Sequence, residues 1–145
     1  MTRSFIADAS VAIAWVHPAQ ATTETDAMLD FLAEGGSLVV PSLWPLEVAN
    51  AITVLRRRRK LTPDEAQTAI EMLRELPVII DHEAAAIAFT RLADLASNHH
   101  LTVYDATYLE LATRRHLPLA SNDEQMKQAA IRSGVDLWQS NASDE

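Results

Sequence analysis

The chain has 145 residues, enough for one domain with a core of its own, and its lack of cysteine excludes disulfides and thiolate metal sites. The net charge of −8 argues against a protein that binds nucleic acid non-specifically over most of its surface. No apolar run approaches the roughly 18 residues of a membrane span. Because an acid at position 8 does not fit a signal peptide, we expect a cytoplasmic protein with one domain over residues 1–138 and a polar tail at 139–145.

Short apolar runs alternate with helical patterns along the chain, and we predict the runs as strands. In chain order they cover residues 5–7, 38–40, 78–80, 118–120 and 135–138. Helices are predicted over residues 11–16, from Thr22 or Thr23 to about 32, and over 43–55, 63–76, 83–97, 103–112 and 124–132. Buried strands that alternate with helices are typical of a parallel sheet covered on both faces, so the predicted fold class is α/β.

Hydroxyl side chains stand where several of these helices should begin. The strongest signal is the segment Thr62-Pro63-Asp64-Glu65, which predicts a capping box with proline at the first helical position. Ser10 and Ser42 are predicted as N-caps of the helices that follow them. Thr102 is predicted as the N-cap of the next helix, where Asp105 takes the place that glutamate has in a capping box.

The predicted helix at 43–55 leads into a concentrated basic run. Five of the twelve basic residues are consecutive here: Arg56, Arg57, Arg58, Arg59 and Lys60. The helix itself has apolar residues every third position, which predicts one stripe facing the core, formed by Leu46, Ala49, Ile52 and Leu55. Cations favour a helix C-terminus, so the basic run is either a solvated helix end or a contact to RNA phosphates.

Four acids lie after predicted strands or near the starts of predicted helices. Asp8 follows the first strand and Asp123 the fourth, while Glu47 lies one turn into a helix and Asp105 near the start of another. Each has a simpler interpretation as a turn residue, a cap or a partner of the helix dipole. Ligands of open parallel sheets bind at the carboxyl ends of the strands, where these acids would converge.

Converging carboxylates repel one another, and a hard cation such as Mg²⁺ or Mn²⁺ removes that repulsion. A metal held by carboxylates lowers the pKa of a bound water and stabilises charge on a phosphoryl group. Metal-assisted phosphodiester hydrolysis is therefore the chemistry that this pattern favours.

Four segments resemble, in the same order, the motifs of PIN-domain ribonucleases of the VapC toxin type. They read FIADASVAIAW at 5–15, PSLWPLEVANA at 41–51, LTVYDATYLELA at 101–112 and LPLASND at 117–123. The family usually has threonine where Ser121 stands, and serine keeps the hydroxyl. The resemblance covers almost the whole chain, and all four acids of the pattern are present.

This resemblance implies a three-layer α/β/α domain with a short-stranded, mainly parallel sheet. It implies that Mg²⁺ or Mn²⁺ is held by Asp8, Glu47, Asp105 and Asp123, and that a metal-activated water cleaves RNA internally without a covalent enzyme intermediate. Ser10, Asn50 and Ser121 would support the ligands or position water. The family also implies a type II toxin–antitoxin system, with a cognate antitoxin and either a homodimer or a toxin–antitoxin hetero-oligomer.

Two other classes of function fit parts of this pattern. A phosphoacceptor receiver domain would need a second acid beside the first-strand aspartate and a lysine after a late strand, and the sequence has neither. A catalytically idle PIN-fold domain that only binds protein or RNA remains open. The pair His99–His100 has no third metal ligand close in sequence, and the tryptophans Trp15, Trp44 and Trp138 are interpreted as core or dimer packing.

Overall fold

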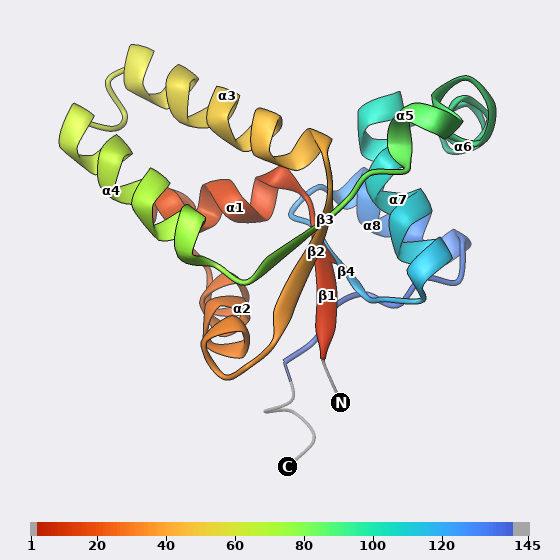
Figure 1. Cartoon of the computed structure of the whole chain (residues 1–145), viewed down its shortest axis with the longest axis horizontal. Coiled ribbons are helices and arrows are strands. Elements are labelled where there is room, and N and C mark those ends of the chain that lie inside the picture. The colour runs from red at the N-terminus through yellow and green to blue at the C-terminus, as the bar shows by residue number, and fades with distance from the viewer. Residues whose placement is uncertain (1–2, 141–145) are drawn as a thin grey trace.

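A four-stranded parallel sheet in the order β3-β2-β1-β4 forms the centre of the computed structural model, which describes residues 3–140 (Figure 1). The strands are β1 (Ser4–Ala7), β2 (Ser37–Pro41), β3 (Val78–Asp81) and β4 (Leu119–Ala120). Ile6 in β1 pairs with Val39 in β2 and with Leu119 in β4. Because every pairing is parallel, the four carboxyl ends share one edge, and the predicted α/β fold class is confirmed.

Helices cover both faces of this sheet and complete three layers. Helices α1 to α4 lie on one side and α5 to α8 on the other (Figure 1). Their bounds are α1 (Ala9–Val16), α2 (Thr23–Ala33), α3 (Leu43–Arg57), α4 (Pro63–Glu75), α5 (Ala84–Ile87), α6 (Ala93–His99), α7 (Val103–Arg115) and α8 (Glu124–Arg132), with a 3₁₀ turn, η1 (Pro18–Gln20), and a π-helical turn, η2 (Ala88–Leu92).

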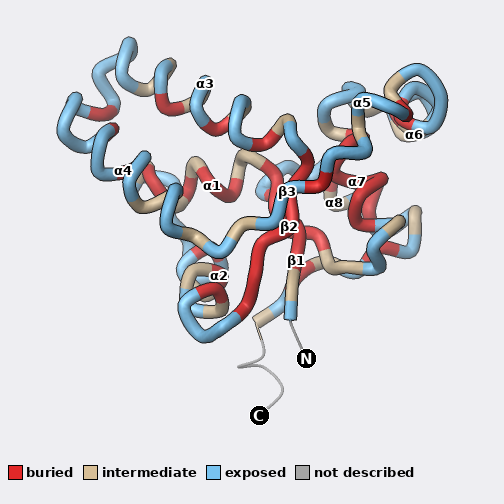
Figure 2. The backbone as a smooth tube through the Cα atoms, in the orientation of Figure 1, coloured by how far each residue is buried: buried red, intermediate tan, exposed pale blue. Residues whose placement is uncertain are grey.

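The core lies between the sheet and its helices, and Figure 2 shows the buried chain concentrated in the central strands and in α7. Seven consecutive residues of α7 are buried, from Ala106 to Ala112. A helix buried over most of its circumference needs apolar residues on every side, which explains the apolar sequence of this segment. Edge strand β3 is more exposed, with Ile79 at 44% and Ile80 at 39%.

Two predicted elements differ in the structure. The last predicted strand, 135–138, is only an isolated bridge between Leu137 and Leu119, because β4 has just two residues to pair with. The predicted helix at 83–97 is divided by η2, a wider turn that leaves Phe89 97% exposed while Leu92 packs in the core. A local widening of this kind does not alter the apolar spacing enough to be seen in the sequence.

The predicted caps are confirmed in part. Thr62 forms the expected capping box, and Thr22 caps α2. Ser10 is not the cap of α1, because Asp8 takes that place and accepts the Ser10 backbone N–H at 3.1 Å. Ser42 has helical dihedral angles and makes no capping hydrogen bond with its side chain, so that prediction was wrong.

The predicted core stripe of α3 was wrong in part, because Ile52 is buried and Leu55 packs against the core as predicted, whereas Leu46 and Ala49 are exposed. Leu46 is 70% exposed, and the buried residues are Trp44, Val48 and Ile52. The buried residues are four positions apart, whereas the predicted stripe used a spacing of three. Both spacings are close to the 3.6 residues of a helical turn, so only the packing of α3 against the rest of the domain decides between them. Burial of Trp44 and Trp138 agrees with the predicted core packing.

No helix within residues 3–140 is long and apolar enough to cross a membrane. Residues 141–145 of the predicted polar tail lie outside the described part of the chain.

Candidate active site

Asp8 stands directly after β1 and is the most deeply buried of the four predicted acids, at 6% exposure. Both of its carboxylate oxygens accept hydrogen bonds from serine hydroxyls. Ser10 donates to Oδ1, and Ser121, which follows β4, donates to Oδ2. Two predicted supporting residues therefore lie on opposite sides of this carboxylate and restrict its rotation.

The same two hydroxyls tie the loop after β4 to the start of α1. Ser10 Oγ accepts the backbone N–H of Asn122 at 3.0 Å, and Ser121 Oγ accepts that of Asp123 at 3.0 Å. The Asn122 side chain also donates to the Ser10 carbonyl at 3.3 Å. Asn122 was not predicted as a site residue, and only its place inside the fourth motif pointed to it.

Glu47 lies on α3 and is partly exposed. Its Oε1 accepts a hydrogen bond of 2.5 Å from the hydroxyl of Tyr108, a fully buried residue of α7. Tyr108 follows Asp105 by three positions, so the two share one face of the helix. The second and third motifs thus meet through a contact that joins residues 61 positions apart.

Asp105 and Asp123 both lie at helix starts, as predicted. The cap of α7 is Thr102, whose hydroxyl oxygen accepts the backbone N–H of Asp105 at 3.0 Å. The Thr102 hydroxyl also acts on the Asp105 carboxylate and lowers its pKa, against the effect of burial. Asp123 is exposed and caps α8 with its own side chain, which accepts the Gln125 N–H at 3.1 Å.

The four carboxylates influence one another electrostatically. Burial is the main cause that raises the pKa of Asp8, of Glu47 and of Asp105. The charge of Asp105 raises the pKa of Asp8 and Glu47 further, and that of Asp123 raises the pKa of Asp105. Hydrogen bonds from Ser10, Ser121 and Tyr108 act in the opposite direction. The fold therefore gathers these acids at one edge of the sheet, within reach of each other's field.

This edge suits a hard divalent cation. Its donors are carboxylate oxygens that repel one another, which is the chemistry that Mg²⁺ and Mn²⁺ prefer and neutralise. Within residues 3–140, no three acidic or histidine side chains already stand in a compact metal-binding group.

The remaining predicted residues lie further out. Asn50 is exposed on α3, almost one turn beyond Glu47. The basic run is exposed where α3 ends and the chain turns into α4, at the tip of a hairpin that projects away from the sheet (Figure 1). Arg57 is ten residues beyond Glu47, so the helix rise separates them by roughly 15 Å.

Another acid at the carboxyl edge is neutralised within the fold. Asp81 ends β3 and is buried, and it forms ion pairs of 2.9 Å with Arg114 and with Arg115. Hydrogen bonds from Arg114 are the main cause that lowers the pKa of Asp81 below its ordinary value. Asp81 therefore differs from the four predicted acids, which have no such cationic partner among their described contacts.

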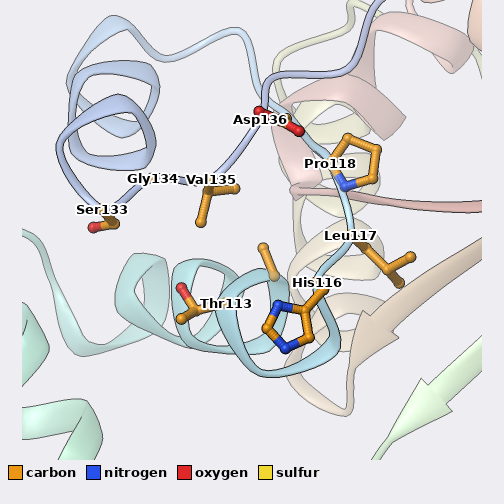
Figure 3. A pocket seen from close by; sticks show the side chains of 9 residues that line it. Thr113, His116, Leu117, Pro118, Ser133, Gly134, Val135 and Asp136 are labelled. Atoms are coloured by element: carbon orange, nitrogen blue, oxygen red, sulfur yellow. The ribbon is translucent and has the colours of Figure 1, made fainter.

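A hollow of about 340 Å³ lies apart from the acids, between the end of α7 and the segment after α8 (Figure 3). His116, Pro118, Ser133 and Asp136 are among the residues that line it. None of the predicted site residues belongs to this hollow.

The sequence pattern of the PIN domain matches residues 5–132. The chain belongs to the PIN domain family. A comparison with curated proteins finds no match, whereas several solved PIN-like structures share the fold. PAE2754 from Pyrobaculum aerophilum is 21% identical with a TM-score of 0.61, and the alignment covers 89% of this chain and 87% of that one.

Two further structures extend this likeness. VapBC2 from Rickettsia felis, bound to a DNA fragment from its promoter, is 11% identical with a TM-score of 0.65, covering 93% of this chain and 97% of that one. VapC20 from Mycobacterium tuberculosis, a toxin that cleaves the sarcin-ricin loop, is 15% identical with a TM-score of 0.59, covering 86% and 94%. At these identities the likeness establishes the shared fold.

Proposed function

We propose that this PIN domain is the toxin of a type II toxin–antitoxin system and acts as a divalent-metal-dependent endoribonuclease in the cytoplasm. The observation that carries the proposal is the group of acids at the carboxyl edge, with three raised carboxyl pKa values and mutual repulsion. The fold shared with a toxin that cleaves the sarcin-ricin loop supports RNA as the substrate.

Asp8, Glu47, Asp105 and Asp123 are the proposed ligands of Mg²⁺ or Mn²⁺. A metal held there supplies a water of lowered pKa and stabilises charge on the phosphoryl group. Ser10 and Ser121 donate their hydroxyl protons to Asp8, which suits them to holding a ligand in place rather than to nucleophilic attack. Hydrolysis by water, without a covalent enzyme intermediate, agrees with this arrangement.

Asn50 is proposed to position water or substrate at the outer side of the site. It is exposed, and it lies three residues after Glu47, on the same face of α3. Its amide offers both a donor and an acceptor to a bound molecule.

Removing a single carboxylate charge tests the enzyme. We expect Asp8→Asn and Asp105→Asn to fold but to lose cleavage of RNA in Mn²⁺ or Mg²⁺, and we expect EDTA to abolish cleavage by the wild type. The exposed loop residue Asp136, changed to asparagine, is the matched control. Sequencing of cellular RNA ends after induction, with Asp105→Asn beside the wild type, identifies the target. Equal cleavage by the site variants and the wild type contradicts the proposal, and RNA binding without cleavage favours an idle domain.

The basic run Arg56–Lys60 is proposed to contact RNA phosphates. All five side chains are exposed at the tip of the α3–α4 hairpin, where they are free to meet a phosphate backbone. Each phosphate contact to single-stranded RNA contributes about −0.7 to the slope of log binding constant against log salt concentration. Neutralising Arg56 to Arg59 is expected to make this slope shallower by up to about 3. An unchanged slope would rule out the contact.

A cognate antitoxin is the proposed protein partner, in a homodimer or a toxin–antitoxin hetero-oligomer. An apolar groove of about 380 Å³ between α3, α4 and edge strand β3 offers a surface for it, lined in part by Trp44, Ile52, Leu73 and Ile80. Light scattering of the chain alone, and of the chain co-expressed with a candidate antitoxin, tests both partners. A monomer under both conditions would contradict this proposal.

A further inference from the structure

The hydrogen bond between Tyr108 and Glu47 joins two very different environments. Tyr108 is 1% exposed and belongs to α7, where seven consecutive residues are buried, so its ring has little freedom to move. Glu47 is partly exposed on α3 and has a long, flexible side chain. The phenol hydroxyl has one proton, and it donates that proton to Glu47 Oε1 at 2.5 Å.

The charges around Glu47 would otherwise drive its carboxylate away. The negative charges of Asp105 and Asp8 act on it unfavourably, and water is accessible on the outer side of α3. Asp8 is restrained by hydrogen bonds from Ser10 and Ser121, whereas the Glu47 carboxylate receives its hydrogen bond from Tyr108. The Tyr108 hydroxyl is therefore the contact that opposes rotation of Glu47 into solvent.

We propose that Tyr108 is a positioning residue of the metal site, whose hydroxyl holds the Glu47 carboxylate toward Asp8 and Asp105. A carboxylate has about four lone-pair sites, so a bond at Oε1 leaves capacity for a cation. Groups that orient metal ligands from behind typically change metal affinity by about 10- to 100-fold when they are removed. This inference rests on the proposed metal-dependent function and extends it to a residue outside the four acids.

Binding of Mn²⁺ to the full chain, measured by calorimetry and by electron paramagnetic resonance, tests the inference without an activity assay. Tyr108→Phe removes only the hydroxyl and keeps the buried ring. We expect it to weaken Mn²⁺ binding by about tenfold, with an unchanged circular dichroism spectrum. Tyr104→Phe is the matched control, because Tyr104 is on the same helix but 61% exposed, and it should bind Mn²⁺ as the wild type does.

A double-mutant cycle with Glu47→Ala, which removes the acceptor oxygen as well as the charge, separates positioning from packing. If Tyr108 acts through Glu47, adding Tyr108→Phe to Glu47→Ala weakens Mn²⁺ binding no further. The role of Tyr108 would be overturned if Tyr108→Phe weakened Mn²⁺ binding equally with and without Glu47, or if its affinity were within about twofold of the wild type. Neither result would affect the proposed metal-dependent function. Absence of Mn²⁺ binding in the wild type would instead overturn the proposed metal-dependent function, and this inference with it.

Discussion

Replacing Asp81 by asparagine removes the charge that joins the end of β3 to the last turn of α7. Arg114 donates to both Asp81 oxygens, at 2.9 and 3.0 Å, and Arg115 donates to Oδ2 at 2.9 and 3.1 Å. The same helix carries Asp105 and Tyr108 near its start. Asp81 thus anchors the far end of the element that presents two residues to the carboxyl edge.

The expected loss of stability depends on how deeply Asp81 and its two arginine partners are buried. Removing one partner of a buried ion pair costs about 3–5 kcal/mol when the other charge stays buried. Here the Arg114 and Arg115 side chains remain 28% and 39% exposed, and Arg114 keeps Glu110 at 2.6 Å. Water and Glu110 therefore compensate in part, and we expect the free energy of unfolding to fall by about 2–3 kcal/mol.

Urea denaturation at pH 7, followed by circular dichroism, measures this loss. The pKa of Asp81 is lower in the folded protein than in the unfolded chain, so its stabilising contribution is complete above the unfolded pKa of about 3.9 and is lost as the pH falls below it. The difference between Asp81→Asn and the wild type should accordingly shrink in acid. Asp136→Asn is the exposed control. A loss below about 0.5 kcal/mol at pH 7, the range of ordinary surface substitutions, would refute the reasoning.

Three further predictions concern the whole fold. Burial and mutual repulsion raise the pKa values of Asp8, Glu47 and Asp105, so the metal-free protein should lose stability as the pH rises through these values. Urea denaturation in EDTA at several pH values should show that the free energy of unfolding falls less steeply with pH in Asp8→Asn than in the wild type, and an equal dependence on pH would contradict this. Gly36→Ala places a Cβ atom 2.2 Å from the Phe31 ring and 2.8 Å from the Phe31 carbonyl oxygen, so the free energy of unfolding should fall by about 1–3 kcal/mol, and no loss in urea would contradict this clash. Thr62→Ala should cost about 1 kcal/mol in the same assay by removing the cap of α4, whereas Thr53→Ala, exposed on α3, should cost much less.

The elements that were predicted correctly depend on residues close together in the sequence. Thr62 and Glu65 are three positions apart, and their reciprocal bonds need only the first turn of α4. The error at α3 has a different origin. Leu46 and Val48 are both apolar, and only the position of the helix against the rest of the domain decides that Val48 is buried while Leu46 is 70% exposed.

The candidate site divides in the same way. The four motifs predicted which acids belong to the site and placed them after strands or near helix starts. Their convergence was predicted because a parallel sheet brings the carboxyl ends of its strands to one edge. The hydrogen bond from Tyr108 to Glu47 spans 61 positions, and the Asp81 pairs span 33 and 34. Nothing in the residue types near Asp81 distinguished it from a metal ligand, since its neutralising arginines come from the end of α7.

The sequence by itself determined the α/β class, most helix starts and the family of this domain, because alternation, caps and motifs are read within a few residues. The tertiary structure alone decided that Asp81 is neutralised by arginines, that Ser10 and Ser121 each reach a different oxygen of Asp8, and that Tyr108 holds Glu47. These choices depend on distances between segments far apart in the chain. The field at the carboxyl edge arises from those distances and from the burial that accompanies them.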